Sequence, residues 1–146
     1  MDVNPLCLIN VFLAILALVL YIIGSYKFYY YRNRYLLYLG MAIGIDILTA
    51  TLASLGITPT VQLESMVTVP WHSMLFKVHV IFSMIGFCGF IILFLYLIFR
   101  RSTKYAVWIR KWQYLALLPI WIIGESIALT NSLMKIFWGT RLFDMI

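Results

Sequence analysis

The run MLFKVHVIFSMIGFCGFIILFLYLIF, residues 74–99, contains a single charged residue, Lys77. About 20 apolar helical residues cross the hydrocarbon core of a bilayer, so this run is long enough to span a membrane. Three further runs have the same character: Leu6–Gly24, Tyr35–Gly56 and Trp112–Phe137. The sequence therefore predicts an all-α protein, an integral membrane up-and-down four-helix bundle, with residues 1–146 as one transmembrane domain.

Composition supports the same class. Hydrophobic residues make up 64% of the chain, charged residues 11%, and the mean hydropathy is +1.00, which is not typical of a soluble domain. The first run has no Lys or Arg before it and follows Asp2, so we interpret it as a retained helix and not as a signal peptide. Little chain is left for an aqueous domain, and any activity is expected within the bundle, at its mouths or in a complex.

Basic residues predict the orientation in the membrane. Loops 25–34 and 100–111 hold eight of the eleven Lys and Arg residues, whereas loop 57–73 has none. Since cytoplasmic loops are enriched in Lys and Arg, we expect those two loops in the cytoplasm, and loop 57–73 and both termini outside the cell membrane. The net charge of +6 then reflects topology and attraction to anionic lipids. The bilayer is the expected partner, and nothing indicates a nucleic acid.

Two acidic residues interrupt the apolar runs. Asp46 lies in the middle of the second run and Glu125 in the middle of the fourth. A charged side chain at the centre of a spanning helix costs roughly 3 kcal/mol on insertion scales, so such residues normally face a partner, a cavity or a pathway. We expect both to face inward and to interact. At least one should be protonated at neutral pH, because two ionised carboxylates in a low-dielectric core repel each other.

Helical spacing predicts further members of the same site. Thr49 shares a face with Asp46, Ser83 shares one with His79, and Asn131 lies close to the face of Glu125. At 1.5 Å per residue the two acids lie near mid-bilayer and His79 nearer the outer surface, with Leu, Ile, Phe and Tyr in the cytoplasmic half. This arrangement predicts a pocket that opens outward, is sealed inward, and takes protons, a cation or a small ligand.

Other roles stay open from the sequence. Buried polar residues also hold helices together, which would suit a structural or assembly subunit that pairs with a membrane partner or with a second copy. A weaker alternative is a haem- or quinone-binding electron-transfer protein. His72 and His79 lie about 10 Å apart on one helix, too far to ligate one iron from both sides. They remain metal candidates, and Met66 and Met74 near His72 could form an outer copper site.

The sequence contains no motif that indicates an enzymatic reaction or a cofactor. The sequence has no Gly-rich phosphate loop, nucleophile elbow or zinc-type cluster of Cys and His, which favours a non-enzymatic role and identifies no cofactor. Cys7 and Cys88 differ by about 20 Å in depth, so we expect them not to pair.

The segments LALVLYIIG, LGMAIGIDILTATLASLG, LFKVHVIFSMIGFCGFIILFLYLIF and WQYLALLPIWIIG resemble, in their order, features of the HsmA-like family of small bacterial four-helix membrane proteins. The resemblance covers about residues 15–130. The matching positions are Tyr21, Gly24, Asp46, Thr49, His79, Pro119 and Gly124. Further histidines of the pattern, late in helix three and early in helix four, are replaced here by Ile, Phe, Lys and Trp. The resemblance thus implies the four-helix fold and leaves a histidine-dependent cofactor role without its ligands.

Overall fold

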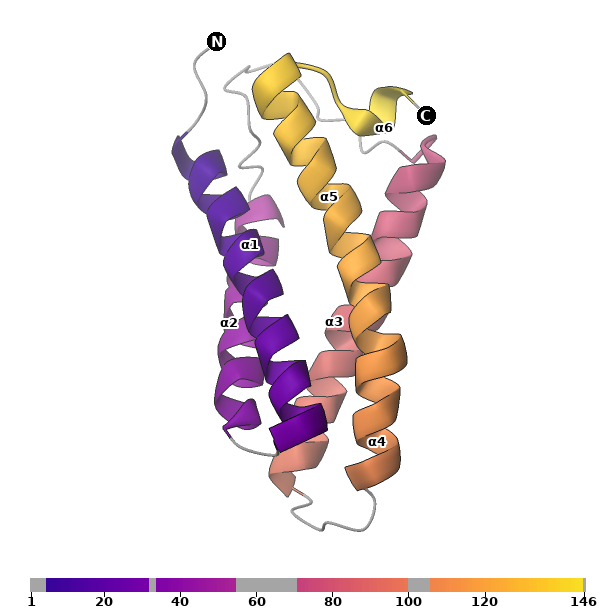
Figure 1. The fold of residues 1–146 in the computed structure, drawn as a ribbon. Coiled ribbons are helices and arrows are strands. Elements are labelled where there is room, and N and C mark those ends of the chain that lie inside the picture. The colour runs from indigo at the N-terminus through magenta and orange to yellow at the C-terminus, as the bar shows by residue number, and fades with distance from the viewer. Residues whose placement is uncertain (1–4, 32–33, 55–70, 100–105, 146) are drawn as a thin grey trace.

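The structure, a computed structural model, describes residues 5–31, 34–54, 71–99 and 106–145. Its elements are α1 (Pro5–Tyr26), the π-helix η1 (Lys27–Tyr31), α2 (Tyr35–Ser54), α3 (Met74–Phe99), α4 (Ala106–Trp112), the π-helix η2 (Gln113–Leu117), α5 (Leu118–Trp138) and α6 (Leu142–Met145). Successive long helices run in opposite directions, and α1 begins at the end of the bundle where α5 ends (Figure 1).

In the described part of the chain, four stretches are long and apolar enough to cross a membrane: Leu8–Tyr31, Tyr35–Leu52, Met74–Phe99 and Val107–Trp138. Large apolar side chains cover the outside of the bundle. Phe99 is 81% exposed and Phe12 65% exposed, which suits a lipid environment and not water. The predicted all-α four-helix bundle is confirmed, and the chain is a multi-pass membrane protein.

Helix boundaries differ from those predicted at the basic end. α3 begins and ends as predicted, but α1 continues into η1, and the helix of the last span begins with α4 at Ala106 and not at Trp112. Parts of loops 25–34 and 100–111 are therefore helical. Pro119 lies in the first turn of α5, directly after the irregular turn η2, and α5 continues from there without interruption. A π-turn satisfies backbone groups that proline would leave without a partner, so the helix is not broken.

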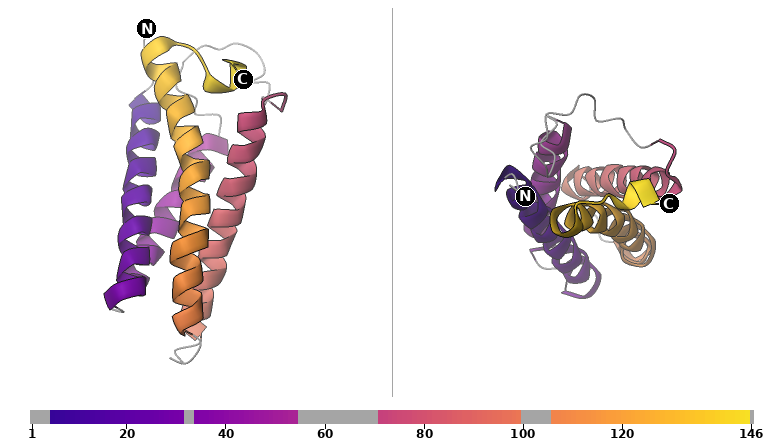
Figure 2. Two further views of the ribbon diagram at one scale, coloured as in Figure 1. Left: turned by 45° about the vertical axis from the view of Figure 1, so that its right-hand side comes forward. Right: turned by 90° about the horizontal axis from the view of Figure 1, so that it is seen from above.

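Helices pair closely through glycine. α1 packs mainly on α2, and α3 packs mainly on α5, an arrangement that Figure 2 shows from the side and from above. A Cβ on Gly86 would lie 2.5 Å from Trp121 Cβ, and one on Gly124 would lie 2.6 Å from the backbone nitrogen of Ser83. A Cβ on Gly44, by contrast, would meet no atom of the described residues within 4 Å. The tightest approach to backbone atoms among the described glycines thus lies between α3 and α5.

An aromatic cluster fills the middle of the bundle. The ring of Tyr21 lies 4.4 Å from that of Phe90 and 4.3 Å from that of Trp121, measured between centroids. All three side chains are 1% exposed or less. Rings offset in this way add to the stability that burial alone provides. The cluster closes the bundle between its two ends.

The basic half of the bundle is less apolar than predicted. Ser25 and Gln113 are fully buried there, and Gln113 Nε2 donates a 3.1 Å hydrogen bond to the carbonyl oxygen of Ser25. Arg110 Nη1 lies 3.5 Å from the carbonyl oxygen of Tyr29. The π-turn η2 begins at Gln113, and helical irregularities of this kind redirect side chains. These contacts join the last span to the end of the first.

Candidate functional site: an intramembrane carboxyl pocket

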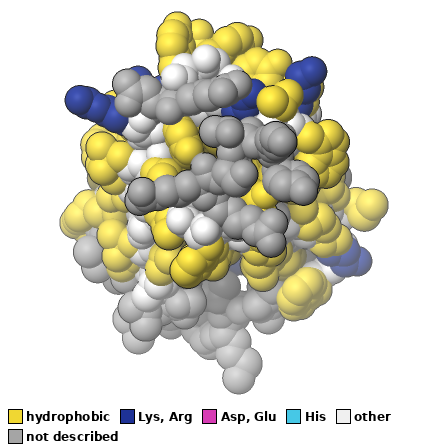
Figure 3. Space-filling view, turned by 90° about the horizontal axis from the view of Figure 1, so that it is seen from below, with side chains coloured by type: hydrophobic (Ala, Val, Ile, Leu, Met, Phe, Trp, Pro, Cys, Tyr) yellow, Lys and Arg dark blue, Asp and Glu magenta, His cyan; other side chains and the backbone are white. Residues whose placement is uncertain are grey.

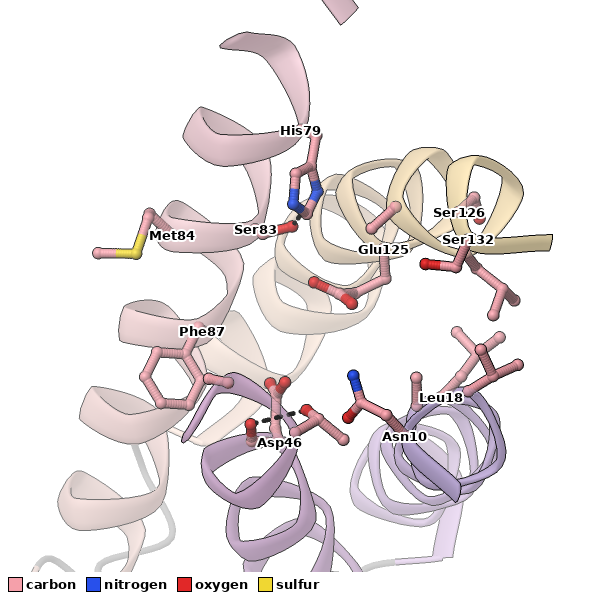
Figure 4. A pocket seen from close by; sticks show the side chains of 16 residues that line it. Asn10, Leu18, Asp46, His79, Ser83, Met84, Phe87, Glu125, Ser126 and Ser132 are labelled. Atoms are coloured by element: carbon pink, nitrogen blue, oxygen red, sulfur yellow. Dashed lines mark hydrogen bonds between the residues drawn. The ribbon is translucent and has the colours of Figure 1, made fainter. Parts of the chain in front are cut away.

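A cavity of about 340 Å³ lies between the four spans, in the half of the bundle nearer the start of α1. Each span contributes side chains to its wall, and Figure 4 shows how they lie. Those with polar groups are Asn10, Asp46, Thr49, His79, Ser83, Glu125, Ser126 and Ser132. The cavity is at the lower end of the size range of small-molecule sites.

Asp46 lies at the floor of the cavity and is 8% exposed. Its Oδ2 accepts hydrogen bonds from Tyr21 Oη at 3.1 Å and from Trp121 Nε1 at 3.3 Å. Both donors belong to the aromatic cluster, so the cluster orients the carboxyl group and closes the cavity behind it. Neither bond uses Oδ1. Thr49, one turn further along α2, donates its hydroxyl to the carbonyl oxygen of Asp46 at 2.8 Å.

Glu125 faces the same cavity from α5, and its carboxyl group points into the space between α2, α3 and α5 (Figure 4). Both acids line the cavity and so face inward, whereas their interaction stays a prediction. Their protonation at neutral pH stays a prediction.

His79 connects Glu125 to the mouth of the pocket. Its Nδ1 lies 2.8 Å from the carbonyl oxygen of Gly124 and 3.1 Å from Ser83 Oγ. A carbonyl oxygen only accepts, so the bond to Gly124 requires that Nδ1 carries the hydrogen, and Ser83 Oγ can share it only as an acceptor. The Ser83 hydroxyl hydrogen is then free for the neighbouring Glu125 carboxyl group. His79 Nε2 is left outside both bonds.

Asn10 on α1 is a site residue that the sequence analysis missed. Its side chain points into the cavity beside the two carboxyl groups (Figure 4). Its Oδ1 is buried and accepts no hydrogen bond from the described residues. An Asn near the start of an apolar run, one turn before Ala14 on the same helix face, was the available signal. Helical spacing alone could not show that this face of α1 turns toward α2 and α5.

Asn131 is a predicted site residue that the structure places elsewhere. Its Oδ1 accepts a 3.3 Å hydrogen bond from the backbone nitrogen of Phe143. Gly139 ends α5 with φ 70°, a left-handed conformation that glycine adopts without strain, and the chain then turns back into α6. Asn131 therefore holds α6 on α5, and Phe143 packs on His79 with a ring separation of 6.2 Å.

The metal candidates are not brought together. His72 is exposed, Met74 is 68% exposed, and Met66 lies outside the described residues. Within residues 5–31, 34–54, 71–99 and 106–145, no three His, Cys, Asp or Glu side chains form a group that could hold a metal ion. Cys88 is exposed, and the side chain of Cys7 lies outside the described part, so their pairing is untested.

Comparison with known proteins adds no identification. No family model, no curated protein and no solved structure matches this chain. The resemblance to the HsmA-like family stays a prediction, and any functional conclusion depends on the pocket itself.

Proposed function

We propose that this protein binds and releases protons at the Asp46–Glu125 pair, as part of handling a small ligand or cation in the intramembrane pocket. This proposal is supported by one observation above all: two carboxyl groups from different spans face one cavity inside the membrane-spanning region. Two acids in a low-dielectric site titrate as a coupled pair, because ionisation of one disfavours ionisation of the other. Binding of a positive charge in the pocket would favour the loss of their protons.

The surrounding contacts give the two acids different roles. Asp46 is held by two fixed donors, which stabilise it as an acceptor at the floor. Glu125 lies beside Ser83, which contacts His79, so a polar chain leads from this carboxyl group toward the end of the bundle where α3 begins. Glu125 is therefore the proposed group for exchange with the exterior. The Tyr21, Phe90 and Trp121 rings separate both acids from the opposite end.

Infrared spectroscopy of the carboxyl C=O stretch tests this proposal. In detergent-solubilised protein titrated from about pH 4 to about pH 9, we expect the band of protonated, buried carboxyl groups to be lost as the pH rises. Asp46→Asn and Glu125→Gln should each remove part of that band and shift the titration of the acid that remains. Asp144→Asn, an acid paired with Arg141 outside the pocket, is the control and should leave the band unchanged. If neither pocket variant alters the titration, the proposal is wrong.

The orientation in the membrane is a second proposal. Seen from the end at which α2 and α4 begin, Lys and Arg side chains lie at the rim of the bundle (Figure 3). The described basic residues in η1, α4 and the turn before α2 are Lys27, Arg34, Arg110 and Lys111. We infer that this end faces the cytoplasm, and that the carboxyl pocket opens toward the outside.

Cysteine labelling of intact cells tests the orientation. In a background without Cys7 and Cys88, we expect Thr60→Cys to react with a membrane-impermeant maleimide and Thr103→Cys to react only after the membrane is permeabilised. Both positions lie in connections between spans. The reverse pattern would overturn the proposed orientation.

A further inference from the structure

We propose that the ligand of the pocket is a protonated amine that carries an apolar body, an alkyl- or arylammonium ion. This inference rests on the proposed function, because the same two acids would bind protons or the ammonium group. It names the chemical class of the ligand from the charge, the hydrogen-bond acceptors and the wall of the cavity.

Charge selects a cation. Among the described residues, the cavity wall includes Asp46 and Glu125 and no Lys or Arg. An ionised carboxylate inside a membrane is stabilised by a positive charge close to it, and an anionic ligand would be repelled. The cation would therefore compete with protons for the same two groups.

Carboxyl and amide oxygens of the wall are open to a ligand as acceptors, whereas the Ser126 and Ser132 hydroxyls and Asn10 Nδ2 can also donate. Asp46 Oδ1 is not used by the two bonds from the aromatic cluster, and Asn10 Oδ1 is buried and accepts no hydrogen bond from the described side chains. Glu125 adds a second carboxyl group. An ammonium group has N–H donors to match them, whereas a fully methylated nitrogen has none. Hydrogen bonds between charged partners are about twice as strong as neutral ones.

The rest of the wall suits an apolar body. Leu18, Met84, Phe87 and Leu129 line the cavity beside the acids. A cavity of about 340 Å³ holds far more than one ion, since a water molecule occupies about 30 Å³ of liquid. Apolar walls reward burial of a hydrocarbon group and offer no ligands to a bare metal ion. An inorganic cation would leave most of this space without favourable contacts.

Equilibrium dialysis with radiolabelled phenethylammonium tests the inference, with protein-free micelles as the measure of partition into detergent. We expect saturable binding to the wild type that weakens as the pH falls, because protons compete for the carboxylates. Asp46→Asn and Glu125→Gln should each weaken binding about tenfold or more, which is the effect of losing one charge-assisted contact. Asp144→Asn, an acid outside the cavity, should bind as the wild type does.

Competition separates the ligand class from the alternatives. Unlabelled phenethylammonium should displace the label, whereas phenethyl alcohol, of the same shape without the charge, and sodium ion should not. Equal displacement by the alcohol or by sodium would overturn the inference. Absence of saturable binding, in protein whose carboxyl band titrates as described above, would also overturn it while leaving the proton-binding proposal in place.

Discussion

Gly124→Ala is expected to destabilise the folded protein by about 3 kcal/mol, the upper end of the usual cost of overpacking a core. The added Cβ would lie 2.6 Å from the backbone nitrogen of Ser83 and 2.7 Å from its Oγ. A backbone atom cannot rotate away, so α3 and α5 must separate. Their separation would also disturb the bond from His79 to the Gly124 carbonyl oxygen.

The same substitution at Gly44 is the matched control. Alanine is favoured over glycine in a helix by about 1 kcal/mol, and a Cβ on Gly44 would meet no described atom within 4 Å. We therefore expect Gly44→Ala to leave stability unchanged or to raise it slightly. The measurement is the free energy of unfolding by SDS in mixed micelles, followed by tryptophan fluorescence. Equal stability of the two alanine variants would contradict the close packing of α3 on α5.

Asp46→Ala is expected to cost about 2 kcal/mol, because it removes the acceptor of two buried donors, the Tyr21 hydroxyl and the Trp121 indole N–H. Hydrogen bonds between membrane helices average less than 1 kcal/mol each, so the cost comes mainly from donors left without a partner. Asp46→Asn keeps an oxygen acceptor and should cost about half as much. The same unfolding measurement compares the two variants.

A double-mutant cycle identifies the cause. Tyr21→Phe removes one of the donors, so in the Asp46→Ala background it should be far less costly than in the wild type. If the two substitutions are additive, Tyr21 and Asp46 are not coupled and the hydrogen bond contributes nothing measurable. Stability is the readout here, whereas proton binding is measured separately by the carboxyl band.

Much of the fold followed from apolar run length. The third span was predicted to the residue, because its apolar run is bounded on both sides by residues of other character. The ends of the first and fourth spans were misplaced, since basic and aromatic residues such as those at 27–31 can continue a helix into the membrane interface. Run length determines that a helix spans the bilayer, but not how far it extends beyond.

Much of the site also followed from the sequence, because a polar side chain inside a spanning helix is costly in any position that faces lipid. On this ground, the sequence predicted inward-facing positions for five residues, all of which line the cavity: Asp46, Thr49, His79, Ser83 and Glu125. The cost of facing lipid does not distinguish a side chain that lines the cavity from one that is buried elsewhere in the bundle. Asn131 satisfies the same reasoning by holding α6 and not by lining the cavity.

The sequence by itself determined the class, the number of spans and the two acids, because each depends on the transfer of a residue from water to hydrocarbon, a property of that residue and its near neighbours. Only the tertiary structure decided which groups meet. Asn10 joins the pocket, and Tyr21 and Trp121 bind Asp46, through contacts between different spans. The rotation and separation of those spans depend on where the backbones can approach, at Gly86 and Gly124, and side-chain spacing within one helix does not contain that information.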